Sequence, residues 1–95
     1  MRAAIGERPN ASGYAAIDDL DIAPIRCDRV RLQYQRFLRA GLPRAFVVSA
    51  DGQRFMWSAG QADALSRLLT ACESLSAQQC KPYAVDDDVV WTPNG

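Results

Sequence analysis

The residues of this chain with the clearest chemistry are its three cysteines, because the sequence contains no histidine. Seven residues separate Cys72 from Cys80, a spacing that favours a disulfide across the loop between a helix and a strand. Two buried thiols are the alternative, since an unpaired cysteine packs as a small apolar side chain. A structural zinc ion normally takes four cysteine or histidine ligands, so we expect no metal site.

The third cysteine, Cys27, lies immediately before a predicted helix. Reactive thiols occur at such positions because the positive end of the helix dipole favours the thiolate. A thiol-redox role, or a disulfide to a second molecule, is therefore one interpretation of Cys27. An ordinary free thiol is the simpler one.

Other residue types give little indication of catalysis. A chain without histidine lacks the commonest general base. Ser49 and Ser58 lie in no nucleophile-elbow motif, and nothing in the sequence brings Asp51 and Asp63 together as an acid–base pair. Asp86-Asp87-Asp88 could bind a cation, but adjacent carboxylates at a hairpin tip point in different directions. We expect the chain not to be an enzyme and to need no cofactor.

Charge excludes a general attraction to polyanions, because eleven basic residues balance eleven acidic ones. The arginines are nevertheless concentrated in the first predicted helix, where Arg29, Arg36 and Arg39 lie away from the apolar stripe. They are candidate anion-binding residues, and a solvated helix face is the plainer interpretation. Nucleic acid is not the expected partner, although binding of an anion or nucleic acid through this helix remains an alternative.

The periodicity of apolar residues defines the elements that must position these groups. It predicts a helix, a β-hairpin, a second helix and a second hairpin, over residues 28–40, 45–58, 61–75 and 83–91. The sequence therefore predicts an α+β fold with a mostly antiparallel sheet covered on one face by two helices. Residues 1–12 are predicted to be a mobile arm, 13–92 a single domain and 93–95 a tail.

The predicted strands are apolar on both faces. Opposite the expected core face lie Val47, Met56 and Val90, which are candidate partner-binding residues. A sheet that is apolar on both faces must cover its second face with another segment or with a partner. A protein partner or a second copy of the chain is therefore expected. No apolar run reaches the length of about 20 residues that a membrane span needs.

Three stretches of the chain resemble a group of small uncharacterised exported bacterial proteins. They are Leu42-Pro43-Arg44-Ala45-Phe46-Val47-Val48-Ser49-Ala50-Asp51-Gly52, Ala71-Cys72-Glu73 and Cys80-Lys81-Pro82-Tyr83-Ala84-Val85-Asp86-Asp87-Asp88-Val89-Val90-Trp91. The resemblance covers roughly residues 34 to 91 and does not include Cys27. It implies a periplasmic or secreted location and a disulfide, and it carries no activity. Together with the residues, it favours a non-catalytic module that binds a protein or associates with itself.

Overall fold

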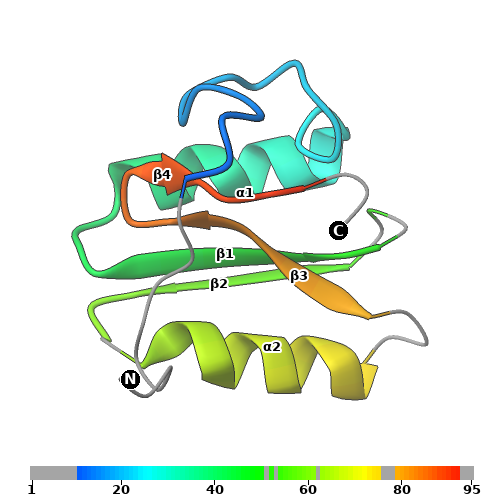
Figure 1. Ribbon diagram of the computed structural model, residues 1–95, viewed down its shortest axis with the longest axis vertical. Coiled ribbons are helices and arrows are strands. Elements are labelled where there is room, and N and C mark those ends of the chain that lie inside the picture. The colour runs from blue at the N-terminus through cyan, green and yellow to red at the C-terminus, as the bar shows by residue number, and fades with distance from the viewer. Residues whose placement is uncertain (1–10, 51, 53, 62, 76–78, 93–95) are drawn as a thin grey trace.

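The computed structural model describes residues 11–50, 52, 54–61, 63–75 and 79–92. In chain order its elements are α1 (Asp28–Arg39), β1 (Arg44–Ser49), β2 (Phe55–Ala59), α2 (Ala64–Leu75), β3 (Cys80–Val85) and β4 (Asp88–Val89). The strands form one antiparallel sheet in the order β2-β1-β3-β4 (Figure 1). The predicted α+β class with an antiparallel sheet is confirmed. Most of the predicted arm (1–10) and the tail (93–95) lie outside the described residues.

The two helices lie on opposite faces of the sheet, so the prediction that both cover one face is wrong (Figure 1). Alternation along β1 explains the arrangement, because successive side chains of a strand point to opposite faces. Phe46 and Val48 pack with α1, whereas Ala45 and Val47 pack with α2. We call these two sides the α1 face and the α2 face. Every residue of β1 is buried, which requires a cover on each side.

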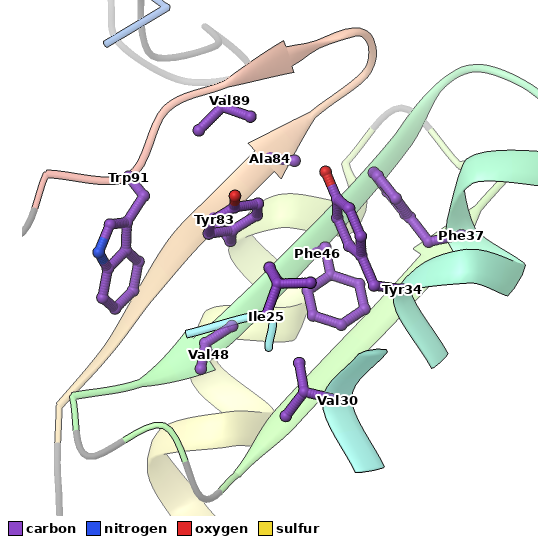
Figure 2. Close-up of a cluster of buried hydrophobic side chains, with 10 residues drawn as sticks. All are labelled: Ile25, Val30, Tyr34, Phe37, Phe46, Val48, Tyr83, Ala84, Val89 and Trp91. Atoms are coloured by element: carbon purple, nitrogen blue, oxygen red, sulfur yellow. The ribbon is translucent and has the colours of Figure 1, made fainter. Parts of the chain in front are cut away.

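Aromatic side chains fill the core between α1 and the sheet (Figure 2). Tyr34 of α1 meets Phe46 of β1 edge to face, with ring centroids 5.1 Å apart, and meets Tyr83 of β3 in the same way at 5.4 Å. Phe37 stacks on Tyr34 at 5.4 Å. Such offset and edge-to-face contacts are the arrangements that aromatic rings prefer. Rings from a helix and two strands thus pack into one cluster.

The segment that precedes α1 completes the α1 face. Ile25 is fully buried in the aromatic cluster, and the hydroxyl of Tyr34 donates a hydrogen bond to the carbonyl of Ile17. Ser12, expected to be part of the mobile arm, donates its N–H to the carbonyl of Val89 in β4 over 2.9 Å. The described part of this segment is therefore held to the sheet as well as to α1, and it lies beside the β4 end in Figure 1.

A disulfide joins the elements of the α2 face. Cys72 in α2 is bonded to Cys80, the first residue of β3, in agreement with the pairing that the sequence favours. Both cysteines are buried, and they pack in the cluster that contains Val47 and Leu68. The bond therefore ties α2 to the strand on the far side of β1 from β2.

Removal of the disulfide by the double substitution Cys72→Ala/Cys80→Ala should lower the free energy of unfolding by about 2 to 3 kcal/mol. The bond closes a short loop and so restricts the unfolded chain. Urea unfolding measures the change, and Cys27→Ala is the matched control because that thiol is exposed and unbonded. Alkylation of the unfolded, unreduced protein, produced in an oxidising compartment, should modify Cys27 alone. Three modified cysteines would contradict the bond.

Candidate interaction site at the edge of the sheet

The residues predicted to bind a partner do not form an exposed surface. Val47 is fully buried beneath α2, and Met56 is half-buried against the same cluster. Val90 is only 7% exposed. The second apolar face of the sheet is thus covered by α2 at Val47 and Met56, and Val90 is likewise buried within the chain. With its faces covered, the edges of the sheet are the remaining candidate surfaces for an interaction.

The two edges of the sheet differ in how they are protected. At one edge, β4 has only two residues, and Ser12 bonds to the carbonyl of Val89. At the other edge lies β2, five residues long and half-buried throughout. Phe55-Met56-Trp57-Ser58-Ala59 contains no proline and no charged residue, the two features that commonly prevent an edge strand from pairing. By composition, β2 is the edge open to an added strand.

The hydrogen-bond pattern shows which groups of β2 face outward. The N–H of Ser49 donates to the carbonyl of Arg54, and the N–H of Gly60 donates to the carbonyl of Pro43. Hydrogen-bonded pairs alternate along an antiparallel ladder, so even-numbered residues from 54 to 60 direct their backbone groups toward β1. The backbone groups of Phe55, Trp57 and Ala59 therefore point away from the sheet.

We call these outward N–H and C=O groups the β2 edge. Among the described residues, none hydrogen bonds to them. The hairpin pattern pairs β2 with β1 but does not show on which side of β1 the third strand joins, so the sequence could not show that these groups face outward.

One side of the β2 edge is bordered by α1. The indole Nε1 of Trp57 donates a hydrogen bond to Oε1 of Gln33, 3.2 Å away. Residues three and four apart share a helix face, so Arg29 and Arg36 lie on the same side of α1 as Gln33. Both arginines are exposed. Arg39, the third predicted anion-binding residue, is also exposed but lies farther around the helix.

Two arginines near α1 have internal roles instead. Arg31 pairs with Asp21 over 2.9 Å and donates to the carbonyl of Leu20, which holds the preceding segment. Arg44 is buried and bonds to the turn between β3 and β4. Of the arginines that the sequence concentrates between positions 26 and 44, the structure therefore places Arg29 and Arg36 beside the β2 edge.

The chain matches no protein-family model, no curated protein and no solved structure. Among the described residues, no helix is long and apolar enough to cross a bilayer.

The remaining candidates for chemistry have structural environments. Cys27 is an exposed thiol at the N-cap of α1 and makes no side-chain capping bond. Two carboxylates of the acidic turn accept hydrogen bonds from Arg44. The backbone N–H of Arg44 donates to Oδ1 of Asp86, and its side-chain Nη2 donates to Oδ1 of Asp87. Within the described residues, no group of three or more cysteine or acidic side chains could hold a metal ion.

Among the described titratable groups, two buried tyrosines are those whose ionisation the fold changes most. Burial raises the pKa of the Tyr34 phenol, and the nearby Tyr83 raises it further. Burial is also the main cause of the raised pKa of Tyr83, whose hydroxyl has no hydrogen-bond partner among the described atoms. Both phenols stay neutral at physiological pH, so they contribute packing in the core rather than acid–base chemistry.

Proposed function

We propose that this chain is a non-catalytic protein-binding domain that accepts an extended segment of its partner as an additional strand beside β2. The observation that supports this proposal is the open, uncharged β2 edge. Outward N–H and C=O groups recognise any extended backbone, and the strand bound in this way adds to the sheet. The sheet faces are already covered by α1 and α2, so this edge is the part of the sheet whose backbone groups are available to a partner.

An oxidising location fits this proposal. The Cys72–Cys80 bond would persist in a periplasmic or extracellular setting, where disulfides are stable. The resemblance to small exported bacterial proteins supports the same location. We therefore propose that the domain meets its partner outside the cytoplasm.

Amide hydrogen exchange in the free protein tests whether the edge is open. The amides of Phe55, Trp57 and Ala59 should exchange on the order of 100-fold faster than those of Met56 and Ser58, whose N–H groups face β1. NMR resolves the five amides in one experiment. Equal protection of both sets would contradict an open β2 edge.

Binding is tested with peptides selected from a random library on the immobilised domain. A bound peptide should slow exchange at the three outward amides, and Ala59→Pro should weaken it about tenfold by removing one outward N–H. Ala59→Val is the matched control because it keeps the N–H and suits a strand. Failure to select any binder, or binding that leaves these amides unprotected, would overturn the proposed function.

A further inference from the structure

The backbone groups of the β2 edge are complementary to those of a second β2 edge. Trp57 is the middle residue of the strand, and the outward residues Phe55 and Ala59 lie two positions on either side of it. A two-fold axis through Trp57, perpendicular to the sheet, sets Trp57 opposite Trp57 of a second copy and Phe55 opposite Ala59. Opposed outward residues can exchange two N–H···O=C bonds in each pair. A shift by one residue in either direction leaves an outward residue beyond the end of the other strand.

The side chains of this register also fit by size. Residues directly opposite each other share a face of the sheet, with Cβ atoms about 5 Å apart. On the α1 face the ring of Phe55 would lie beside the methyl group of Ala59, and on the α2 face Met56 would lie beside Ser58. Each large side chain thus meets a small one. A register displaced toward the start of β2 would instead set Phe55 against Trp57.

No charged residue of one strand meets a charged residue of the other in this register. The strand itself carries no charge, and Arg54, which precedes it, falls opposite Gly60, which follows it. On α1 the side chain beside the axis is the uncharged Gln33, because it accepts the hydrogen bond from the indole of Trp57. The groups along the backbone pairing and at the axis are therefore compatible with a second copy.

We infer that the strand bound beside β2 is β2 of a second copy of this chain, an inference that rests on the proposed function. The two sheets join through their β2 strands into one continuous sheet. A strand already held by β1 pairs without the ordering cost that a flexible segment pays on binding. Pairing also covers the half-buried side chains of Phe55, Met56 and Trp57. Five residues form a small interface, so we expect a dissociation constant on the order of 10 to 100 µM.

Charges on α1 limit the strength of this dimer. In Figure 1, α1 runs along the direction of β1 and β2, so the two-fold axis places the two α1 helices antiparallel on the same side of the joined sheet. Arg36 is exposed and lies one turn from Gln33, so it approaches the arginine-rich α1 of the other molecule. Salt screens such repulsion, and association should therefore strengthen as the ionic strength rises.

Sedimentation velocity of the whole chain, from about 1 to 500 µM, measures the association. The sedimentation coefficient should rise with concentration from that of a monomer to that of a dimer. Ala59→Pro removes one outward N–H from each copy, so its effect counts twice in a symmetric dimer and should weaken it about 100-fold. Ala59→Ser is the matched control because it keeps the N–H and nearly the same size, and it should leave the affinity within about threefold.

Amide exchange of the parent protein locates the interface without any substitution. Well below the dissociation constant, the outward amides of Phe55, Trp57 and Ala59 should exchange fast, as expected for the open edge. As the concentration enters the dimeric range, these three amides should become protected together. The amides of Met56 and Ser58, which face β1, should change little.

Neutral substitutions on α1 test the placement of the helices. Arg36→Gln should strengthen the dimer about threefold or more at low ionic strength. Arg39→Gln removes the same charge about 120° around the helix from Gln33 and should alter the affinity much less. Both positions are exposed, so neither substitution should disturb folding.

The outcomes separate this inference from the proposed function. A monomer at every concentration, with library-selected peptides still protecting the three amides, would overturn the second copy and keep strand addition. A dimer that leaves these amides unprotected, or that Ala59→Ser weakens as much as Ala59→Pro, would overturn the pairing of two β2 strands. Association that weakens with salt would contradict the placement of the α1 helices. Absence of both self-association and peptide binding would overturn the inference and the proposed function together.

Discussion

Replacement of Arg44 by alanine should lower the free energy of unfolding by about 3 to 5 kcal/mol. The guanidinium is buried and fully engaged. Its Nη1 donates to the carbonyls of Phe37 at 2.7 Å and Ala40 at 3.2 Å, and its Nε donates to the carbonyl of Asp86 at 3.0 Å. Its Nη2 pairs with Asp87 at 3.1 Å, and its carbon centre lies 4.6 Å from the ring of Phe37. One side chain thereby joins the end of α1 to the turn between β3 and β4.

The loss in Arg44→Ala arises mainly from the acceptors that remain. The last carbonyls of a helix have no partner within it, and a buried acceptor left unsatisfied costs about 1 to 3 kcal/mol. Arg44→Lys should recover only part of the stability, because an ammonium group cannot reproduce the planar fork of donors. Arg39→Ala is the control at an exposed position of α1.

Urea unfolding distinguishes these variants. We expect a lower midpoint with an unchanged slope for Arg44→Ala, and a midpoint near that of the parent protein for Arg39→Ala. A loss below about 1 kcal/mol in Arg44→Ala would mean that water replaces the guanidinium at the helix end. The pair with Asp87 would explain little of any loss, since that carboxylate is largely exposed.

Phe46→Ala should have an effect of similar size, about 3 to 5 kcal/mol, because it opens a cavity at the centre of the aromatic cluster. Phe46 is fully buried in the central strand. Its ring meets Tyr34 at 5.1 Å and Phe37 at 5.5 Å edge to face, and stacks on Phe55 at 6.0 Å. No other strand residue makes ring contacts with as many described aromatic side chains.

Two controls separate the cavity from the change of residue type. Phe46→Leu keeps most of the volume and should cost less than half as much as Phe46→Ala. Leu32→Ala removes an apolar side chain that is 53% exposed on α1 and should change stability by at most about 0.5 kcal/mol. Thermal unfolding followed by near-ultraviolet circular dichroism measures all three. Equal losses in Phe46→Ala and Leu32→Ala would contradict the central position of this ring.

Local patterns were enough to predict the elements. The apolar spacing after Asp28 predicts a helix that the structure begins at the same residue. The second helix begins at Ala64 rather than Gln61, because the N–H of Ala64 bonds to the carbonyl of Gln61 in a turn that precedes it. The spacing of Cys72 and Cys80 favoured the disulfide that the structure contains, because the bond joins a helix to the next strand across only a short loop.

Long-range relations were not predicted. The sequence shows that the face carrying Val47 is apolar but not which element covers it, and in the structure Val47 is buried beneath α2. The role of Arg44 was missed because its acceptors in the turn at Asp86 lie 42 residues away. One signal was present: the residues from Ala45 to Val48 are all apolar, which is typical of a strand buried on both faces and hence central.

The position of β1 at the centre of the sheet has a consequence for how the chain reaches its native state. The hairpin of β1 and β2 is local and can form early, whereas Ala45 meets Val85 only after the chain has passed through α2. Closing that long loop costs entropy before the contacts form. Until β3 docks, β1 presents a second open edge that is apolar on both sides. Intermolecular pairing competes with folding at that stage, so refolding yield should fall as the protein concentration rises.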